Sequence, residues 1–373
     1  MEFIASAAFG LEGLVIKDLK RMGANGIRPL ASGGVAFEGD FAMAFNANLW
    51  LRTSDRVLLT MGRFEARSFE ELFQGVLAIE WEKIIPDDAQ LPIKAQCARS
   101  QLMSPSDCQS IVKKAVAKRM SQRRSLDWMP ETGAVHEIDV SIHSDVVTVA
   151  LNMSGPALNR RGYRTWNGEA PLRETLAAAV VLCSPWRPKF ALHDPCCGTG
   201  TLLIEAAYIA LDRAPGLTRE FDCEKWPCMP KEEMRKLRLA AKLRFEAGRT
   251  RPLHVSGSDI DPEALELCKK HIRQAGLEGM ITLWCKDLRD ITLPADGGTL
   301  IANPPYGLRL GNTQIAVTVA KQLGILYRRL NNWNLCAITG DKGFEKAFDR
   351  RADKRRRLYN GRLECELLTF NAK

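Results

Sequence analysis

The sequence lacks a hydrophobic run long enough to cross a lipid bilayer. Its longest uncharged apolar stretch is LAAAVVLCSPW at residues 176–186, whereas a membrane-spanning helix needs about 20 such residues. No basic segment precedes the first apolar run, and Glu12, Lys17 and Asp18 interrupt that run, so no signal peptide is expected. These absences predict a cytoplasmic protein that does not bind a membrane.

The 11 cysteines follow no repeated spacing. Disulfide scaffolds are shorter and denser in cysteine, and a structural zinc ion needs four ligands. Cys196 and Cys197 are adjacent, which is poor geometry for one ion, and no second pair follows Cys223 and Cys228. We therefore expect reduced cysteines and no bound metal.

A complete dinucleotide fingerprint is also missing. The stretch DPCCGTG at 194–200 has glycines at 198 and 200, but Leu203 stands where GxGxxG needs its third glycine. That glycine normally lets the helix pack closely against the strand beside the pyrophosphate. A nicotinamide-dependent oxidoreductase is therefore disfavoured, and a nucleoside cofactor without phosphates fits better.

Basic residues are in excess and they are clustered. The formal net charge is +9 and the isoelectric point is about 9.0. Six basic residues and no acid lie in IVKKAVAKRMSQRR (111–124), and three basic residues lie in RRGYR (160–164). The segment RRADKRRR (350–357) has six basic residues against one acid, Asp353. One such cluster would suggest a solvated helix face, but three favour a nucleic acid partner.

The first cluster has the spacing of a helix, expected around 108–122. One side would be apolar, and the basic side chains would lie mostly on the other. Phosphate contacts of this kind position a nucleic acid without reading its sequence. The expected contacts are Lys113, Lys114, Lys118, Arg123 and Arg124, with Arg161 and Arg164 from the second cluster.

The chain divides into two regions of different pattern. Strand-like segments at 2–6, 34–39, 56–66, 91–96 and 137–154 predict an α+β region in the first half. In the second half, strands at 190–194, 254–262, 281–285, 299–303 and 334–339 alternate with helices, which predicts a mostly parallel, doubly wound α/β sheet. Asn360-Gly361 between two strand-like runs predicts a final antiparallel hairpin.

Functional residues gather where the strands of the second half end. The glycine turn follows the first strand, the second strand ends in acids that include Asp259, and Asp287 follows the third strand. Asp259 could accept hydrogen bonds from a ribose, and Asp287 could accept one from an adenine amine. Each acid alone could be a turn or capping residue, and Asp261 is expected to cap the next helix. Open parallel sheets bind ligands along these strand ends.

The fourth strand ends in Asn303-Pro304-Pro305-Tyr306. Two prolines end the strand and make its corner rigid. The Asn303 side-chain oxygen and the Pro304 carbonyl could accept both hydrogens of a base amine and orient its nitrogen toward a donor group. Tyr306 could stack on the base, a contact worth about 1–3 kcal/mol. The base would first have to leave its stack or lie in a single-stranded loop.

These motifs, in this order, resemble the class I S-adenosylmethionine-dependent methyltransferases that modify amino groups. The motifs are DPCCGTGTLLIEAA (194–207), GSDIDP (257–262) and NPPYG (303–307). The segments at 159–181, 309–334 and 351–367 are similar to the bacterial large-subunit ribosomal RNA guanine-N2 methyltransferases. The segment at 48–75 is similar to the entry of the THUMP domain that precedes their catalytic domain.

The resemblance implies four parts of the chain: a ferredoxin-like region (1–60), a THUMP domain (61–155), a linker with a leading helix (156–188) and a class I methyltransferase domain (189–373). It implies S-adenosylmethionine as cofactor, with Asn303, Pro304, Pro305 and Tyr306 at the target amine. The implied cofactor residues are Asp194, Cys196, Gly198, Thr199, Gly200, Thr201, Asp259, Ile260, Asp287 and Asn303. Cys196 departs from the general pattern, which has a glycine there.

The substrate that the resemblance implies is a guanine N2 amine of RNA, with ribosomal RNA favoured. Because adenine N6 is also an exocyclic amine, an adenine-N6 methyltransferase of DNA or RNA stays open. Transfer RNA also stays open, because relatives with THUMP domains act on both kinds of RNA. A catalytically inactive RNA-binding assembly factor is the alternative that is not an enzyme.

Overall fold

The computed structural model describes residues 1–31, 33–124, 130–164, 172–294, 296–305, 313–361 and 363–372. The chain forms two compact units. The first contains Met1–Ala7, Val15–Leu158 and Glu220–Leu237, and the second contains Ala8–Leu14, Asn159–Arg219 and Arg238–Lys373. These limits differ from the four predicted parts, because short segments from elsewhere in the chain join each unit.

The first unit is built on a seven-stranded sheet in the order β2-β3-β1-β4-β7-β6-β5. Only β5 and β6 pair in parallel; the other pairs are antiparallel. The strands are β1 (Glu2–Ser6), β2 (Asn25–Pro29), β3 (Val35–Glu38), β4 (Arg56–Glu65), β5 (Ile93–Ala98), β6 (Ile138–His143) and β7 (Val146–Asn152). The predicted strand run at 137–154 is therefore a hairpin, which turns at Ser144 and Asp145, both with positive φ.

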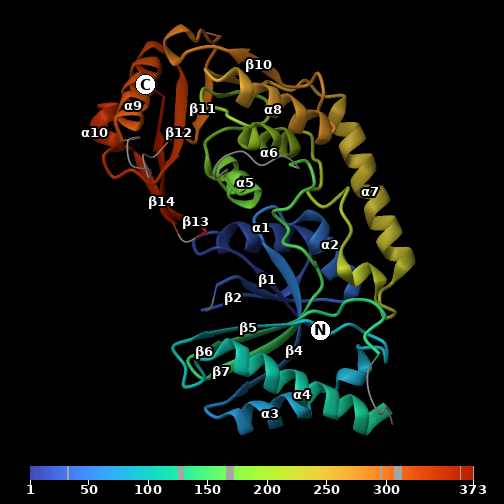
Figure 1. The fold of residues 1–373 in the computed structure, drawn as a ribbon. Coiled ribbons are helices and arrows are strands. Elements are labelled where there is room, and N and C mark those ends of the chain that lie inside the picture. Colours follow the sequence, from blue (N-terminus) through green and yellow to red (C-terminus); the bar gives the residue numbers. More distant parts are fainter. Residues whose placement is uncertain are drawn as a thin grey trace. The chain divides into compact units, whose positions relative to one another are not determined.

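The described residues of this part of the chain form the helices α1 (Glu12–Met22), α2 (Phe41–Trp50), α3 (Phe69–Ala78) and α4 (Pro105–Arg124). Ser68 caps α3 in a capping box with Glu71, which satisfies backbone donors at that helix start. As predicted, Val112, Ala115, Val116 and Met120 of α4 are fully buried. The helix packs on α3 and β5 (Figure 1).

The second unit contains the predicted α/β sheet, in the order β10-β9-β8-β11-β12-β14-β13. Strands β8 to β12 run parallel, and the hairpin β13–β14 adds two antiparallel strands, so this prediction is confirmed. The strands are β8 (Ala191–Asp194), β9 (Val255–Asp259), β10 (Thr282–Cys285), β11 (Gly298–Ala302), β12 (Trp333–Thr339), β13 (Lys354–Asn360) and β14 (Leu363–Phe370).

The helices of this sheet are α5 (Glu174–Cys183), α6 (Thr201–Ala210), α8 (Pro262–Gln274), α9 (Thr313–Arg329) and α10 (Phe344–Phe348). Helix α7 (Lys231–Arg249) begins in the first unit and ends in the second. The turns η1 (Trp81–Lys83), η2 (Asp222–Lys225) and η3 (Leu288–Asp290) complete the described elements. The strand order reverses at β8, whose neighbours are β9 and β11, and α/β sheets bind ligands at such a point.

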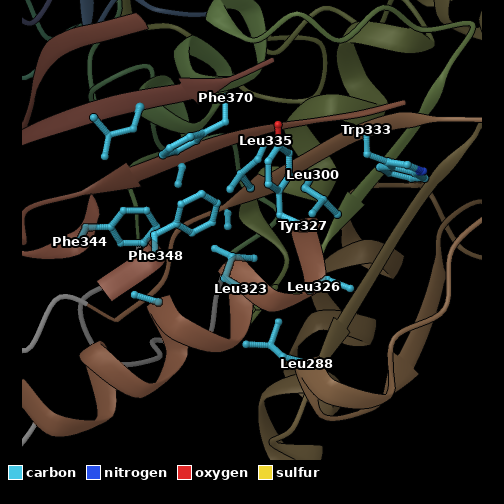
Figure 2. Packing of buried hydrophobic residues seen from close by; sticks show 14 of the residues in the cluster. Leu288, Leu300, Leu323, Leu326, Tyr327, Trp333, Leu335, Phe344, Phe348 and Phe370 are labelled. Carbon is cyan, nitrogen blue, oxygen red and sulfur yellow. The ribbon is translucent and has the colours of Figure 1, made fainter. Parts of the chain in front are cut away.

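A large aromatic and aliphatic core supports the β11 side of this point (Figure 2). Phe348 lies between Phe344 and Phe370, with ring centroids 5.5 and 4.4 Å away. Leu300 of β11 is fully buried in the same cluster. Because a well-packed core is stiff, β11 holds a fixed position, and Asn303 follows its last residue.

Candidate active site

The turn between β8 and α6 depends on its glycines. Gly198 and Gly200 have φ values of +50° and +83°, which favour glycine over residues with a side chain. A Cβ added to Gly200 would lie 2.4 Å from Sγ of Cys268, whereas one added to Gly198 would meet no atom within 4 Å. Gly200 therefore packs the turn against α8, and Gly198 leaves open space beside the backbone.

A cavity of about 460 Å³ lies beside this turn. Six predicted site residues line it: Asp194, Cys196, Gly198, Thr199, Thr201 and Asn303. The structure thus brings together the ends of β8 and β11, which are separated by about a hundred residues in the sequence. The other lining residues were not predicted from the sequence as part of this site; they are Leu172, Cys197, Leu202, Asp261, Glu263, Ala264 and Leu267.

Four predicted cofactor residues are not among those lining residues. Gly200 is the N-cap of α6. Ile260 is 66% exposed on the turn after β9. Asp259 accepts hydrogen bonds from the backbone N–H groups of Gly198, at 2.8 Å, and of Asp261, at 3.0 Å. Each carboxylate oxygen of Asp259 keeps further acceptor capacity, so both oxygens could still accept hydrogen bonds from a ligand.

Asp287 follows β10, and its carboxylate is bound by the Arg289 side chain at 2.8 and 3.0 Å. This hydrogen bonding holds the pKa of the Asp287 carboxyl below its usual range. Asp261 caps α8 by accepting from the Glu263 N–H group, so the predicted cap is confirmed. Asp261 also lines the cavity.

The deepest acid of the cavity is Asp194, which is 1% exposed. Burial raises the pKa of this carboxyl to about 8; the Cys196 N–H group opposes the rise and the Asp259 charge adds to it. Burial likewise raises the pKa of the Cys196 thiol well above its usual value, and the two nearby acids add to this. A thiolate is the reactive form of cysteine, so Cys196 is not suited to be a nucleophile.

Strand β11 ends at Ala302, and the next residue, Asn303, is half-buried and lines the cavity. Pro304 is buried and Pro305 is exposed. Tyr306 lies outside the described residues. An amide at a rigid strand end, facing a cavity with a buried acid, can accept hydrogen bonds from an amine and hold it.

The predicted basic face of α4 is exposed at Lys113, Lys114, Lys118 and Arg123. Nζ of Lys113 lies 2.8 Å from Glu131, and Nζ of Lys118 lies 5.4 Å from the centroid of the Phe73 ring. The side chain of Arg124 is outside the described part. Arg119 of the same helix is turned inward, with its side chain 12% exposed, and is bound by both carboxylate oxygens of Glu82.

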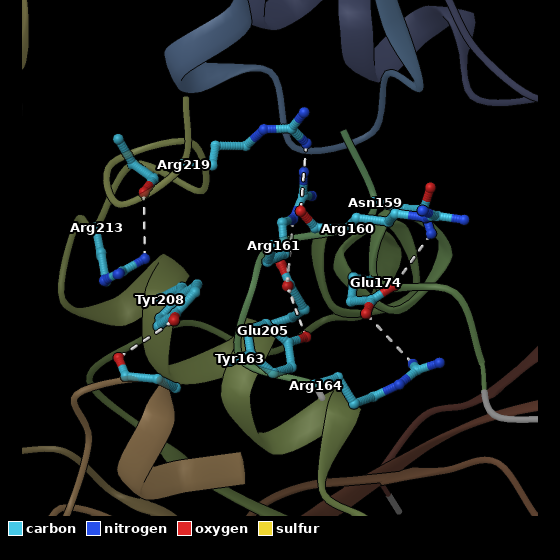
Figure 3. Close-up of polar contacts among 12 residues, drawn as sticks. Asn159, Arg160, Arg161, Tyr163, Arg164, Glu174, Glu205, Tyr208, Arg213 and Arg219 are labelled. Atoms are coloured by element: carbon cyan, nitrogen blue, oxygen red, sulfur yellow. Dashed lines mark hydrogen bonds and ion pairs between the residues drawn. The ribbon is translucent and has the colours of Figure 1, made fainter. Parts of the chain in front are cut away.

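The structure contradicts the predicted RNA contact at Arg161. The Arg161 side chain is 2% exposed, and its Nε atom lies 3.6 Å from Glu205 (Figure 3). Arg164 is 16% exposed and binds Glu174 and the Leu172 carbonyl. In the sequence the two arginines are alike in charge and lie in one basic cluster, but in the structure both contact acids or carbonyls of their own unit.

Among the described residues, no helix has the length and apolar character that a membrane span requires. Within the same residues, no group of three or more histidine, cysteine, aspartate and glutamate side chains is arranged to hold a metal ion. All 11 cysteines are free of disulfides.

Three family models match successive parts of the chain. An "RlmL ferredoxin-like domain" matches residues 2–58, a "THUMP domain" matches 66–152, and an "RMKL-like, methyltransferase domain" matches 161–369.

Curated relatives match nearly the whole chain. "Putative RNA methyltransferase YpsC" of Bacillus subtilis is 36% identical over 372 residues, which are 99% of this chain and 96% of that protein. "Ribosomal RNA large subunit methyltransferase K/L" of Methylococcus capsulatus is 37% identical over 381 residues. That match covers 99% of this chain but only 51% of the relative, which is therefore about twice as long.

Two solved structures have the same fold over nearly their full length. A "predicted N6-adenine-specific DNA methylase" from Listeria monocytogenes has a TM-score of 0.94 and 39% identity, and the match covers 100% of this chain and 96% of the other. SMU.472, "a putative methyltransferase complexed with SAH", has a TM-score of 0.94 and 37% identity, with coverage of 100% and 98%.

Proposed function

Because the chain belongs to the RMKL-like methyltransferase family, we propose that it methylates the N2 amine of a guanine in RNA, with large-subunit ribosomal RNA as the substrate. The cofactor is S-adenosylmethionine. One observation carries the proposal: Asn303, at the end of β11, and Asp194, at the end of β8, line the same cavity at the point where the strand order reverses.

The residues of the cavity fit this cofactor. Gly198 leaves open space beside its backbone, so a ligand can approach closely. The acids Asp194, Asp261 and Glu263 line the wall, which suits the ammonium and sulfonium charges of S-adenosylmethionine. When bound, this cofactor supplies a methyl group that its sulfonium sulfur readily gives up.

The chain's own residues orient the acceptor. Asn303 and the Pro304 carbonyl accept hydrogen bonds from the guanine amine, whose lone pair is otherwise delocalised into the ring. The stiff end of β11 keeps these acceptors in place before the base arrives, so little entropy is lost when it binds. The raised pKa of Cys196 favours direct transfer, without a covalent intermediate on the protein.

The other parts of the proposal concern RNA binding and location. Residues 1–60 form the ferredoxin-like region, 61–155 the THUMP domain and 189–373 the catalytic domain, with 156–188 between them. The exposed basic side of α4 contacts RNA phosphates. Abundant free cysteines and an RNA substrate fit the reducing cytoplasm.

A second candidate is adenine-N6 methylation of DNA, which the name of the Listeria relative suggests. Asn303 and Pro304 would hold an adenine amine equally well. The THUMP match and the names of the two curated relatives favour RNA. Transfer RNA in place of ribosomal RNA, and a non-catalytic role in ribosome assembly, are further outcomes that an assay can separate.

The test is tritium transfer from labelled S-adenosylmethionine to purified ribosomal RNA, transfer RNA and genomic DNA. We expect label in ribosomal RNA alone. Asn303→Ala should remove transfer while S-adenosylhomocysteine (SAH) still binds, because the amide holds the substrate amine. Asn331→Ala is the matched control, since this exposed asparagine precedes β12 and so lies near the amino-terminal ends of the parallel strands, whereas Asn303 follows the carboxyl end of β11. Full activity of Asn303→Ala would remove the proposed role of Asn303.

A further inference from the structure

The segment 159–164 contacts helix α6, whose first residues line the cavity, and helix α5, which begins just after the lining residue Leu172. Side chains of this segment extend toward Glu205 of α6 and Glu174 of α5 (Figure 3). Helix α6 begins at Thr201, and Leu172 lies two residues before α5 begins. Both Thr201 and Leu172 line the cavity, so the segment is connected to two of its walls.

The first connection is to α6. The Tyr163 hydroxyl donates a hydrogen bond to Oε1 of Glu205 at 3.0 Å, and Nε of Arg161 lies 3.6 Å from the same oxygen. Glu205 is fully buried, and Arg161 and Tyr163 are 3% and 2% exposed. A buried charge is costly unless it is paired and hydrogen-bonded, so this cluster fixes the segment firmly to α6.

The second connection is to the start of α5. Nη1 of Arg164 donates a hydrogen bond to the Leu172 carbonyl at 3.1 Å and lies 3.4 Å from Oε1 of Glu174. The other oxygen of Glu174 accepts from the Asn159 amide at 3.4 Å. The Glu174 side chain is only 5% exposed. One arginine thus holds both the backbone of Leu172 and the first turn of α5.

We propose that Arg164 is a positioning residue for the cofactor cavity, which holds the Leu172 wall at a fixed place relative to the α6 wall. The basic segment 160–164 is then an internal connection between two cavity walls and not an RNA-binding surface. This inference rests on the proposed function only in taking the cavity as the cofactor site. Loss of Arg164 would widen the range of positions open to Leu172 and weaken cofactor binding.

Two variants from opposite ends of the contact test this idea. Arg164→Gln and Glu174→Gln should each weaken SAH binding, measured by calorimetry on the full chain, by about tenfold, in line with the loss of one charged hydrogen bond. The double variant should be little weaker than either single variant, because both remove the same interaction. Arg160→Gln is the matched control, since Arg160 is an exposed arginine of the same segment; it should bind SAH like the unaltered protein.

A second readout needs no cofactor. Hydrogen exchange of peptides covering 172–176 should be faster in Arg164→Gln and Glu174→Gln than in Arg160→Gln, while exchange in β12 stays unchanged and so reports an intact fold. If the unaltered protein binds no SAH, the proposed function fails, and the exchange rates still decide the role of Arg164.

The proposal is overturned if exchange at 172–176 and SAH affinity are both unchanged in the two variants. It is also overturned if Arg164→Gln lowers RNA affinity and its salt dependence while Glu174→Gln does not, because that result marks Arg164 as a phosphate contact.

Discussion

Replacing Gly200 with alanine tests how the glycine turn is packed against α8. The change adds one methyl group at a residue with a φ of +83°. That methyl carbon would lie 2.4 Å from Sγ of Cys268, which is fully buried. The substitution therefore combines backbone strain with a steric overlap.

The two costs can be estimated separately. Left-handed backbone at a residue with a Cβ costs about 1–2 kcal/mol. Overpacking in a tight core costs about 1–3 kcal/mol more. Gly200→Ala should therefore lower the free energy of unfolding of the second unit by about 2–5 kcal/mol. In a Cys268→Ala background the overlap with Sγ is gone, and only the backbone cost of about 1–2 kcal/mol should remain.

Thermal unfolding of the four proteins, namely the unaltered chain, both single variants and the double variant, measures this coupling. For a unit of this size, 1 kcal/mol corresponds to about 2–4 °C in Tm. SAH affinity should fall in Gly200→Ala and recover partly in the double variant. Equal losses of Tm in the two backgrounds would refute the reasoning, because the cost could then not come from contact with Cys268.

Three further predictions concern charge. Burial raises the pKa of Asp194 to about 8, so this carboxyl carries a proton at pH 7. Because a cationic ligand favours the carboxylate form, S-adenosylmethionine binding should release up to one proton at pH 7. The affinity for S-adenosylmethionine should therefore weaken as the pH falls below about 8. Calorimetry in buffers of different ionisation enthalpy measures this, and binding without proton release would contradict it. Lys114→Ala should weaken RNA binding by about threefold and lower the slope of log affinity against log salt concentration by about 0.7–0.9. Lys113→Ala should have a smaller effect on RNA affinity, because Glu131 already binds Lys113. Equal losses of RNA affinity for the two variants in filter binding would contradict this prediction. Burial lowers the pKa of His193 to about 3 in the folded protein, whereas histidine in an unfolded chain has a pKa of about 6.5. Between these two values the unfolded chain binds a proton at His193 that the folded protein does not bind. The free energy of unfolding should therefore fall as the pH drops below about 6.5. His193→Gln should make the urea midpoint less sensitive to pH between 6.5 and 4.5, and an unchanged dependence would show that other groups control it.

Local patterns were sufficient to predict the second sheet, although β9 ends at Asp259 and the predicted strand ran on to residue 262. Asp194, Asp259 and Asn303 end strands or follow them as expected, because alternating strands and helices leave few topologies. The apolar side of α4 was predicted for a different reason, because its apolar residues recur with the period of a helix.

Contacts between distant segments could not be predicted in this way. Arg161 resembled a surface residue until the fold placed Glu205 of α6 beside it. Leu172 has no sequence signal for a cavity wall, because its place depends on Arg164 and Glu174. The sequence of the segment 160–164 shows only its positive charge, whereas the acids that pair with Arg161 and Arg164 lie on helices α6 and α5.

We propose that this protein methylates the N2 amine of a guanine in ribosomal RNA. Mass-spectrometric mapping of nucleosides in large-subunit ribosomal RNA, from cells with and without the gene, tests it most directly. The account predicts that one N2-methylguanosine disappears without the gene and returns with the unaltered protein but not with Asn303→Ala. An unchanged N2-methylguanosine pattern, with loss of N6-methyladenine from DNA or RNA, would contradict it.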